Sequence, residues 1–157
     1  MTEPTPKNRT KAQVLVSAGE ESRIARTVLA WLNGSGALPV NAIRYEMLET
    51  GVPNMAMSLT SGTYKTRQFV TGGYQAQMKF ALLYRIQPGD SSDQRLKADE
   101  ALNALGDWVG DPSNLPGLGE RCKVRSVVIE RRALAVAAFD SGDEDHELAL
   151  ALNYEVL

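Results

Sequence analysis

One stretch of the chain constrains the fold more than any other. From residue 74 to residue 86, apolar side chains occupy every second position, and four of the six positions between them are polar. A period of two places the apolar set on one face of a strand, whereas a helix would scatter it around its circumference. We therefore predict a long strand with one buried face, which a register slip of one residue would expose. The buried set is Tyr74, Ala76, Met78, Phe80, Leu82, Tyr84 and Ile86.

Two other segments have the spacing of amphipathic helices. In the first, from Glu20 to about Leu32, apolar residues recur at intervals of three and four, and Gly34 and Gly36 follow. The second is expected to begin after Ser91, which with Gln94 fits a capping box, and to run to about Val109. The predicted buried stripes are Ile24, Val28, Trp31 and Leu32 in the first helix, and Ala98, Leu102, Leu105 and Val109 in the second.

Further strands are expected on both sides of the second helix. Residues 12–18 fit either a strand or an extension of the first helix. An extended polar segment ends at Gly72-Gly73, a hairpin signal because both glycines can adopt positive φ. In the C-terminal part, Val124 and Val128 are expected on one face of a strand. The predicted ranges are 43–47, 55–59 and 63–71, then 123–131, 133–139 and 146–156, with a turn over 140–143.

Helix, strands, helix and strands thus follow one another, and hairpin-type turns join the strands. This order predicts an α+β fold, a two-layer sandwich in which two helices pack on one face of a mostly antiparallel sheet. A length of 157 residues suits one domain, which we assign to residues 11–157. Residues 1–10 are polar, contain two prolines and are interpreted as a flexible N-terminal arm.

Composition argues against several classes of protein. The formal net charge of -2, from 17 basic and 19 acidic residues, provides no overall positive field for binding nucleic acid, although a net charge does not exclude a local basic ring in an oligomer. No apolar run approaches the roughly 18 residues that a membrane helix needs, so we expect no membrane contact. Cys122 is the only cysteine, which excludes an intrachain disulfide and fits a reducing compartment; we expect a packed, unreactive thiol.

Motifs for catalysis or cofactor binding are missing from the sequence. The glycines in 110–119 are not followed by the Lys-Ser/Thr pair of a phosphate-binding loop, and one histidine with one cysteine cannot form a zinc site. His146 is interpreted as a partly buried structural residue. An acidic cluster lacks the spacing of a calcium loop and is interpreted as a solvated turn. We therefore predict no enzyme, no catalytic residue, no metal and no cofactor; the cluster is Asp140, Asp143, Glu144, Asp145 and Glu147.

Two segments point instead to contacts with other proteins. The polar segment 60–73 contains Tyr64, Lys65 and Arg67, and fits equally an exposed edge or a surface that binds a partner through strand addition or polar contacts. The second segment contains Arg131 and Arg132. These arginines ordinarily indicate a solvated face, but in a ring they could line a rim or pair with the acidic turn of a neighbouring subunit.

The order of several short segments resembles the tail-terminator (minor capsid) proteins of long-tailed bacteriophages, the siphophages. The resemblance covers roughly residues 20–157, and it provides no residue motif from which site residues could be transferred. The segments that carry it are Ala30-Trp31-Leu32-Asn33, Phe69-Val70-Thr71-Gly72-Gly73-Tyr74, Phe80-Ala81-Leu82-Leu83-Tyr84-Arg85, Leu105-Gly106-Asp107-Trp108-Val109, Leu115-Pro116-Gly117-Leu118 and Leu152-Asn153-Tyr154-Glu155-Val156.

This resemblance implies a non-enzymatic virion protein, assembled in the host cytoplasm, that forms a six-membered ring. Such a ring caps the tail-tube protein, stops its polymerisation and meets the head-completion or connector protein, while DNA only passes through the lumen. Another head–tail connector, a tail-tube subunit, or a small hydrolase or transferase with scattered site residues stays open as an alternative. An enzyme should present a deep pocket in a monomer, whereas a ring subunit should present two different, complementary flanks.

Overall fold

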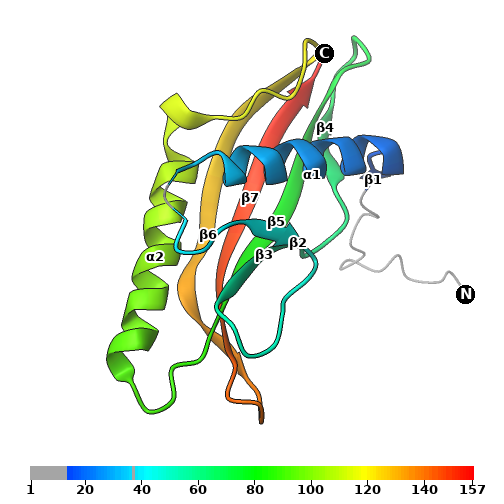
Figure 1. Ribbon diagram of the computed structural model, residues 1–157. Helices are drawn as coiled ribbons and strands as arrows, with labels where there is room; N and C mark the ends of the chain where they lie inside the picture. Colours follow the sequence, from blue (N-terminus) through cyan, green and yellow to red (C-terminus); the bar gives the residue numbers. More distant parts are fainter. Residues whose placement is uncertain (1–13, 37) are drawn as a thin grey trace, which may run out of the picture.

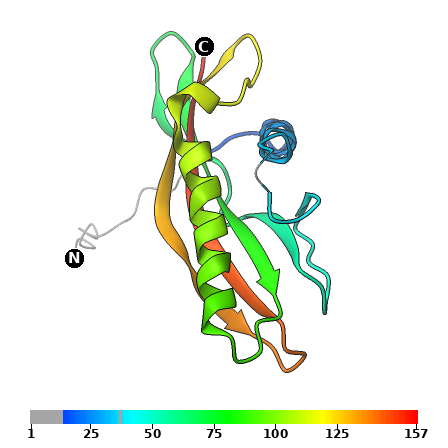
Figure 2. The ribbon, with the colours of Figure 1, turned by 60° about the vertical axis from the view of Figure 1, so that its left-hand side comes forward.

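The computed structural model describes residues 14–36 and 38–157, so the predicted arm over residues 1–10 lies outside the described residues. Figures 1 and 2 show one twisted sheet with both helices on the same face. Helix α1 crosses the strands, whereas α2 runs alongside β6. In chain order the elements are β1 (Val14–Leu15), α1 (Ala18–Asn33), β2 (Ile43–Tyr45), β3 (Asn54–Leu59), β4 (Tyr64–Gln68), β5 (Tyr74–Ile86), α2 (Ser92–Gly110), a short 3-10 helix (Pro112–Asn114), β6 (Cys122–Ala138) and β7 (Glu144–Val156).

The long strand predicted over 74–86 is β5, and it organises the sheet. On one side it pairs with β7 along its whole length. On the other side it pairs with β4 near its beginning and with β3 near its end. Strand β6 adds to β7 and forms one edge, whereas β1 and β2 form the opposite edge. These pairings are antiparallel except for β2 with β3, so the predicted α+β sandwich with a mostly antiparallel sheet is confirmed.

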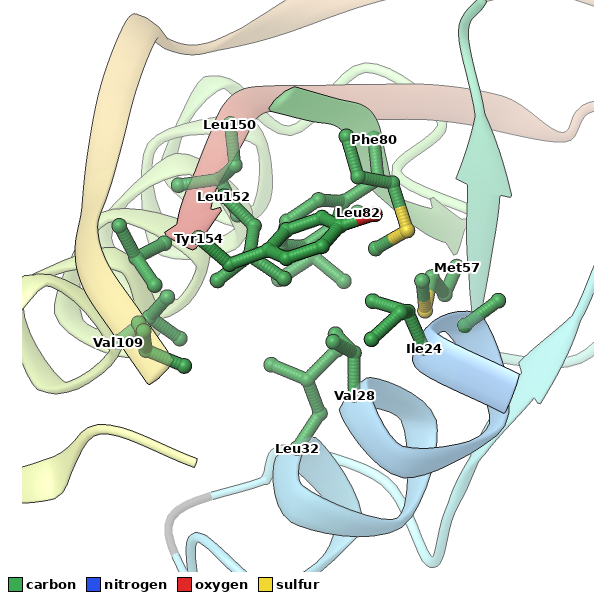
Figure 3. Close-up of a cluster of buried hydrophobic side chains, with 14 of the residues drawn as sticks. Ile24, Val28, Leu32, Met57, Phe80, Leu82, Val109, Leu150, Leu152 and Tyr154 are labelled. Carbon is green, nitrogen blue, oxygen red and sulfur yellow. The ribbon is translucent and has the colours of Figure 1, made fainter. Parts of the chain in front are cut away.

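The core lies between the two helices and the apolar faces of β5 and β7. Both predicted helical stripes face it, although Trp31 is only partly buried. Figure 3 shows the α1 side chains pointing toward the aromatic rings and leucines of the sheet. Each large apolar side chain buried in this way contributes roughly 1.5–3 kcal/mol to stability. Fully buried members are Ile24, Val28 and Leu32 of α1, Leu102 and Val109 of α2, and Phe80, Leu82, Leu152 and Tyr154 of the sheet.

Acidic residues in the first turn of α1 attach this helix to the sheet. The hydroxyl of Tyr154 donates to Glu20 Oε2 at 2.7 Å, and the hydroxyl of Tyr74 donates to Glu20 Oε1. The next residue, Glu21, accepts from the backbone N–H of Thr63 at 2.5 Å. Burial, reinforced by the Glu20 carboxylate, raises the pKa of Tyr154 well above its ordinary value. These bonds connect α1 to three strand regions that are far apart in the sequence.

Strand β6 differs from the prediction. The predicted strands 123–131 and 133–139 form one continuous strand of 17 residues that runs through Arg131 and Arg132. A register shift between Val124 and Ser126 inserts an extra residue, and such a bulge changes which later side chains face the core. Val128 is therefore 46% exposed instead of sharing the buried face of Val124.

Smaller corrections concern turns and edges. Residues 14–15 form a strand, which resolves the ambiguity over 12–18 for the described residues. The Ser91 hydroxyl accepts from the Gln94 N–H as predicted, but the N–H of Ser91 donates to the Pro88 carbonyl, so only half of the capping box forms. In the β4–β5 turn, Gly72 has a φ of 97°. Gly73 meets a different requirement, since an added Cβ would lie 2.5 Å from the Val156 carbonyl oxygen.

Candidate assembly surfaces

The only histidine ties α2 to the sheet. His146 is 1% exposed and places Nδ1 2.6 Å from Asp99 Oδ1 of α2 and Nε2 3.1 Å from Glu144 Oε2. Arg95 of α2 also donates to Glu144 at 2.9 Å. The Asp99 contact thus joins α2 to β7 directly, and Glu144, itself on β7, joins them through Arg95.

The acidic cluster is not the solvated turn that the sequence predicts. Asp143 and Asp145 are 2% and 6% exposed, because each carboxylate is satisfied by a separate partner. Asp145 forms an ion pair with Arg85 at 2.7 Å, and Asp143 accepts from Gln87 at 2.8 Å. Hydrogen bonds from Gln87 and Ser141 hold the pKa of Asp143 below its ordinary value. Within residues 14–36 and 38–157, no group of three or more acidic, histidine or cysteine side chains is placed to hold a metal ion.

Two cavities on the described surface are open to solvent. A cavity of about 310 Å³ lies beside α1 and is lined by Ser22, Ala25, Arg26, Leu29 and Tyr45. Another, of about 350 Å³, includes Arg23 and Cys122. Cys122 is a buried free thiol whose pKa is raised by burial, so it is a packed residue as predicted. No described helix is long and apolar enough to span a membrane.

The β4 residues predicted to contact a partner lie on both faces of the sheet. Tyr64 and Arg67 pair with Gln77 and Gln75, which lie on the face without helices, called the open face below. Lys65 lies on the helix-covered face, where its Nζ is 4.3 Å from the centroid of the Tyr74 ring. Strand β1 pairs with β4 at Tyr64 and Lys65, which leaves Arg67 exposed beyond that short pairing.

The other two predicted contact residues lie on β6, and β5 and β7 separate them from β4. The structure therefore does not bring the two groups of candidates together. Arg131 forms an ion pair at 3.0 Å with Glu147, a member of the acidic cluster in its own chain. This arginine is therefore paired within the subunit and not with the acidic turn of a neighbour. Arg132 is exposed and forms no ion pair with the described residues.

Large apolar side chains are exposed at both edges of the sheet. At one edge they lie along β6, where each is between 41% and 46% exposed. At the opposite edge they lie on β2 and the loop that follows it, where each is between 43% and 54% exposed. We call these surfaces the β6 flank and the β2 flank. The β6 flank contains Val128, Leu134 and Val136, and the β2 flank contains Tyr45, Met47 and Val52.

Glu46, which directly follows β2, was not predicted from the sequence as a candidate contact residue. Within residues 14–36 and 38–157, it is the one non-glycine residue with positive φ, at 55°. This left-handed conformation is uncommon for side chains other than Asn and Asp. The Glu46 carboxylate accepts from the hydroxyl of Ser58 at 2.8 Å and from the N–H of Leu59 at 2.7 Å. The strained backbone thus places an anionic side chain on the β2 flank.

Comparison with known proteins gives a fold likeness only. No protein-family model and no curated protein matches the sequence. The chain superimposes on a chain from the virion of a native gene transfer agent particle, with a TM-score of 0.60 and 15% sequence identity over 88% of this chain and 99% of that chain. A second solved structure, with a TM-score of 0.45 and 14% identity over 90% of this chain and 96% of that chain, is too dissimilar to support an argument. The chain therefore shares the fold of a protein found in a phage-like particle.

Proposed function

We propose that the chain is a structural virion protein, and more specifically a tail terminator whose ring caps the tail tube and joins it to the head connector. The fold likeness to a chain of a gene transfer agent virion supports the virion context. The segment order shared with siphophage tail terminators supports the specific role. In this proposal the chain has no enzymatic activity and needs no cofactor.

The observation that carries the proposal is the pair of apolar flanks at opposite edges of one sheet. Different surfaces that meet head to tail make heterologous contacts, and such contacts generate a closed ring when the rotation between subunits closes. The two flanks differ in their side chains and strand lengths. In the ring, the β2 flank of one subunit would therefore contact the β6 flank of its neighbour. A six-membered ring is the closure that we propose.

Charges on the open face fit a lumen through which DNA passes without being held. Four cations there or beside it form ion pairs with carboxylates of the same chain, so few positive charges are left for phosphate groups. The pairs are Lys79–Glu130, Arg85–Asp145, Arg125–Glu155 and Arg131–Glu147. The proposed lasting partners are therefore other copies of the chain, the tail-tube protein and the head-completion protein.

The absolute mass of the purified chain tests this proposal. Light scattering at several concentrations, alone and with tail tubes, should detect a discrete six-subunit species, at least on tubes. A strict monomer that ignores tubes would contradict the proposal and favour an enzyme. Spontaneous growth into long tubes would instead identify a tail-tube subunit.

Arg67 provides a test of the candidate surface on β4. Arg67 is exposed, its guanidinium lies 5.5 Å from the centroid of the Phe69 ring, and it forms no ion pair with the described residues. Arg67→Glu should therefore leave the melting temperature unchanged. We expect the variant to attach less well to tubes, measured as the fraction that co-sediments with them. Normal ring formation and tube attachment would remove Arg67 from the proposed contact surface.

A further inference from the structure

Strand pairings place the two flanks at the same height of the sheet. Following paired residues from β2 across to β6, Arg44 lies opposite Ala56, which lies opposite Leu83. Leu83 lies opposite Glu147, which lies opposite Leu134 of β6. One row of five residues thus begins in the β2 flank and ends in the β6 flank. Neighbouring subunits that stand side by side would bring the two ends of this row together.

The next row and the one beyond it contain one unpaired charge of each sign. Tyr45 lies at the height of Leu82 and Leu148, and Glu46 follows it. On β6, Arg131 pairs with Ala149 and Leu134 with Glu147, so Arg132 and Ala133 together lie opposite Leu148. Arg132 is therefore within about one residue of Glu46 along the strands, roughly 3.3 Å. Both Glu46 and Arg132 are exposed. Glu46, like Arg132, forms no ion pair with the described residues; it accepts hydrogen bonds only from Ser58 and Leu59.

We propose that Glu46 of one subunit pairs with Arg132 of the next, and that this pair aligns the β2 flank of one copy against the β6 flank of its neighbour. The proposal rests on the ring of the proposed function and specifies its interface. The apolar side chains of the two flanks supply the buried part of the contact, and the charge pair sets its register. The left-handed backbone at Glu46 has a role in this arrangement, because it fixes the carboxylate at the edge of the sheet.

Exchanging the charges tests the pair directly. Glu46→Arg and Arg132→Glu should each weaken ring assembly by about tenfold or more, because each variant presents like charges at every contact. The double variant should assemble like the wild type. An equimolar mixture of the two single variants should also assemble, since alternating subunits then present opposite charges. Glu100→Arg, which makes the same charge change at an exposed position of α2 outside both flanks, should assemble normally.

A cysteine pair keeps the proposal testable if Glu46→Arg misfolds through loss of its bonds to Ser58 and Leu59. Arg44→Cys and Leu134→Cys place thiols at the two ends of the shared row. Native Cys122 is buried and contributes no exposed thiol. Mild oxidation of the double variant on tubes should give a ladder of covalent oligomers ending in the ring, whereas each single variant should stay uncrosslinked.

Separate results overturn the interface and the proposed function. The charge variants could still form normal rings on tubes, and the cysteine pair could fail to crosslink. That result would overturn the proposed interface but leave the terminator role in place. Dimers formed by Leu134→Cys alone would show that two β6 flanks meet, which also overturns it. A wild-type chain that remains a monomer with and without tubes would overturn both.

Discussion

The hydroxyl of Tyr154 gives the sharpest test of how α1 is held on the sheet. Tyr154 is 0% exposed, and its hydroxyl donates to the Glu20 carboxylate at 2.7 Å. Tyr154→Phe deletes this bond without opening a large cavity, and Glu20 keeps its bond from Tyr74. Because a hydrogen bond to a charged group contributes about 1.5–3 kcal/mol, we expect the free energy of unfolding to fall by about 2 kcal/mol.

Urea unfolding measures this loss. A decrease of about 2 kcal/mol with a slope of about 2 kcal/mol/M lowers the midpoint by about 1 M and leaves the slope unchanged. Tyr84→Phe is the matched control, since Tyr84 is partly buried and no hydrogen bond of its hydroxyl to the described residues is found. That control should change stability by less than about 0.5 kcal/mol. Equal midpoints for the two variants would refute the role assigned to the Tyr154–Glu20 bond.

Alkaline pH gives an independent check on the same bond. The folded-state pKa of Tyr154 is raised, first by burial and then by Glu20, so the folded protein holds this proton more tightly than the unfolded chain. The corresponding stability is fully present below the unfolded tyrosine pKa of about 10 and is lost as the pH rises above it. Tyr154→Phe should therefore lose less stability between about pH 9 and 11 than the wild type does.

Three further substitutions test other parts of the structure. Leu82→Asp buries an unpaired charge at a 0% exposed position and should abolish folding; a soluble variant with a cooperative melting curve would contradict the β5 assignment. Gly73→Ala should reduce stability by about 1–3 kcal/mol in urea, because its Cβ would lie 2.5 Å from the Val156 carbonyl oxygen; an unchanged midpoint would show that this close approach is absent. Asp143 has a lowered folded-state pKa, so its contribution is present above the unfolded value of about 3.9 and is lost as pH falls through the folded value. Asp143→Asn should therefore flatten the decline of the melting temperature below pH 4, and an equally steep decline would be evidence against this bonding.

The strand with the longest unbroken period was predictable, whereas the bulged strand β6 was not. The alternation over 74–86 identified β5 with both of its ends, because one buried face over thirteen residues leaves no other register. In β6 the register shifts depend on pairing with β7, which local spacing does not encode. Arg131-Arg132 therefore looked like a break between two strands, although both residues lie inside one.

Assembly surfaces were only partly predictable for a similar reason. Arg132 was singled out because it lies with Arg131 between two predicted apolar strands, and the structure leaves it exposed without an ion pair among the described residues. Glu46 carried no signal, because its residue type does not favour the left-handed conformation and its hydrogen bonds to β3 depend on the tertiary fold. That the two residues lie within about one residue of each other along the strands follows only from the pairing of five strands.

The most direct test of the proposed role is cryo-electron microscopy of tail tubes mixed with the purified chain, with averaging of the tube ends. The proposal predicts one added ring with six copies of this fold at a single end of each tube, and tubes that no longer lengthen when more tube protein is supplied. Tube ends without added density, or copies distributed along the tube wall, would contradict the terminator role.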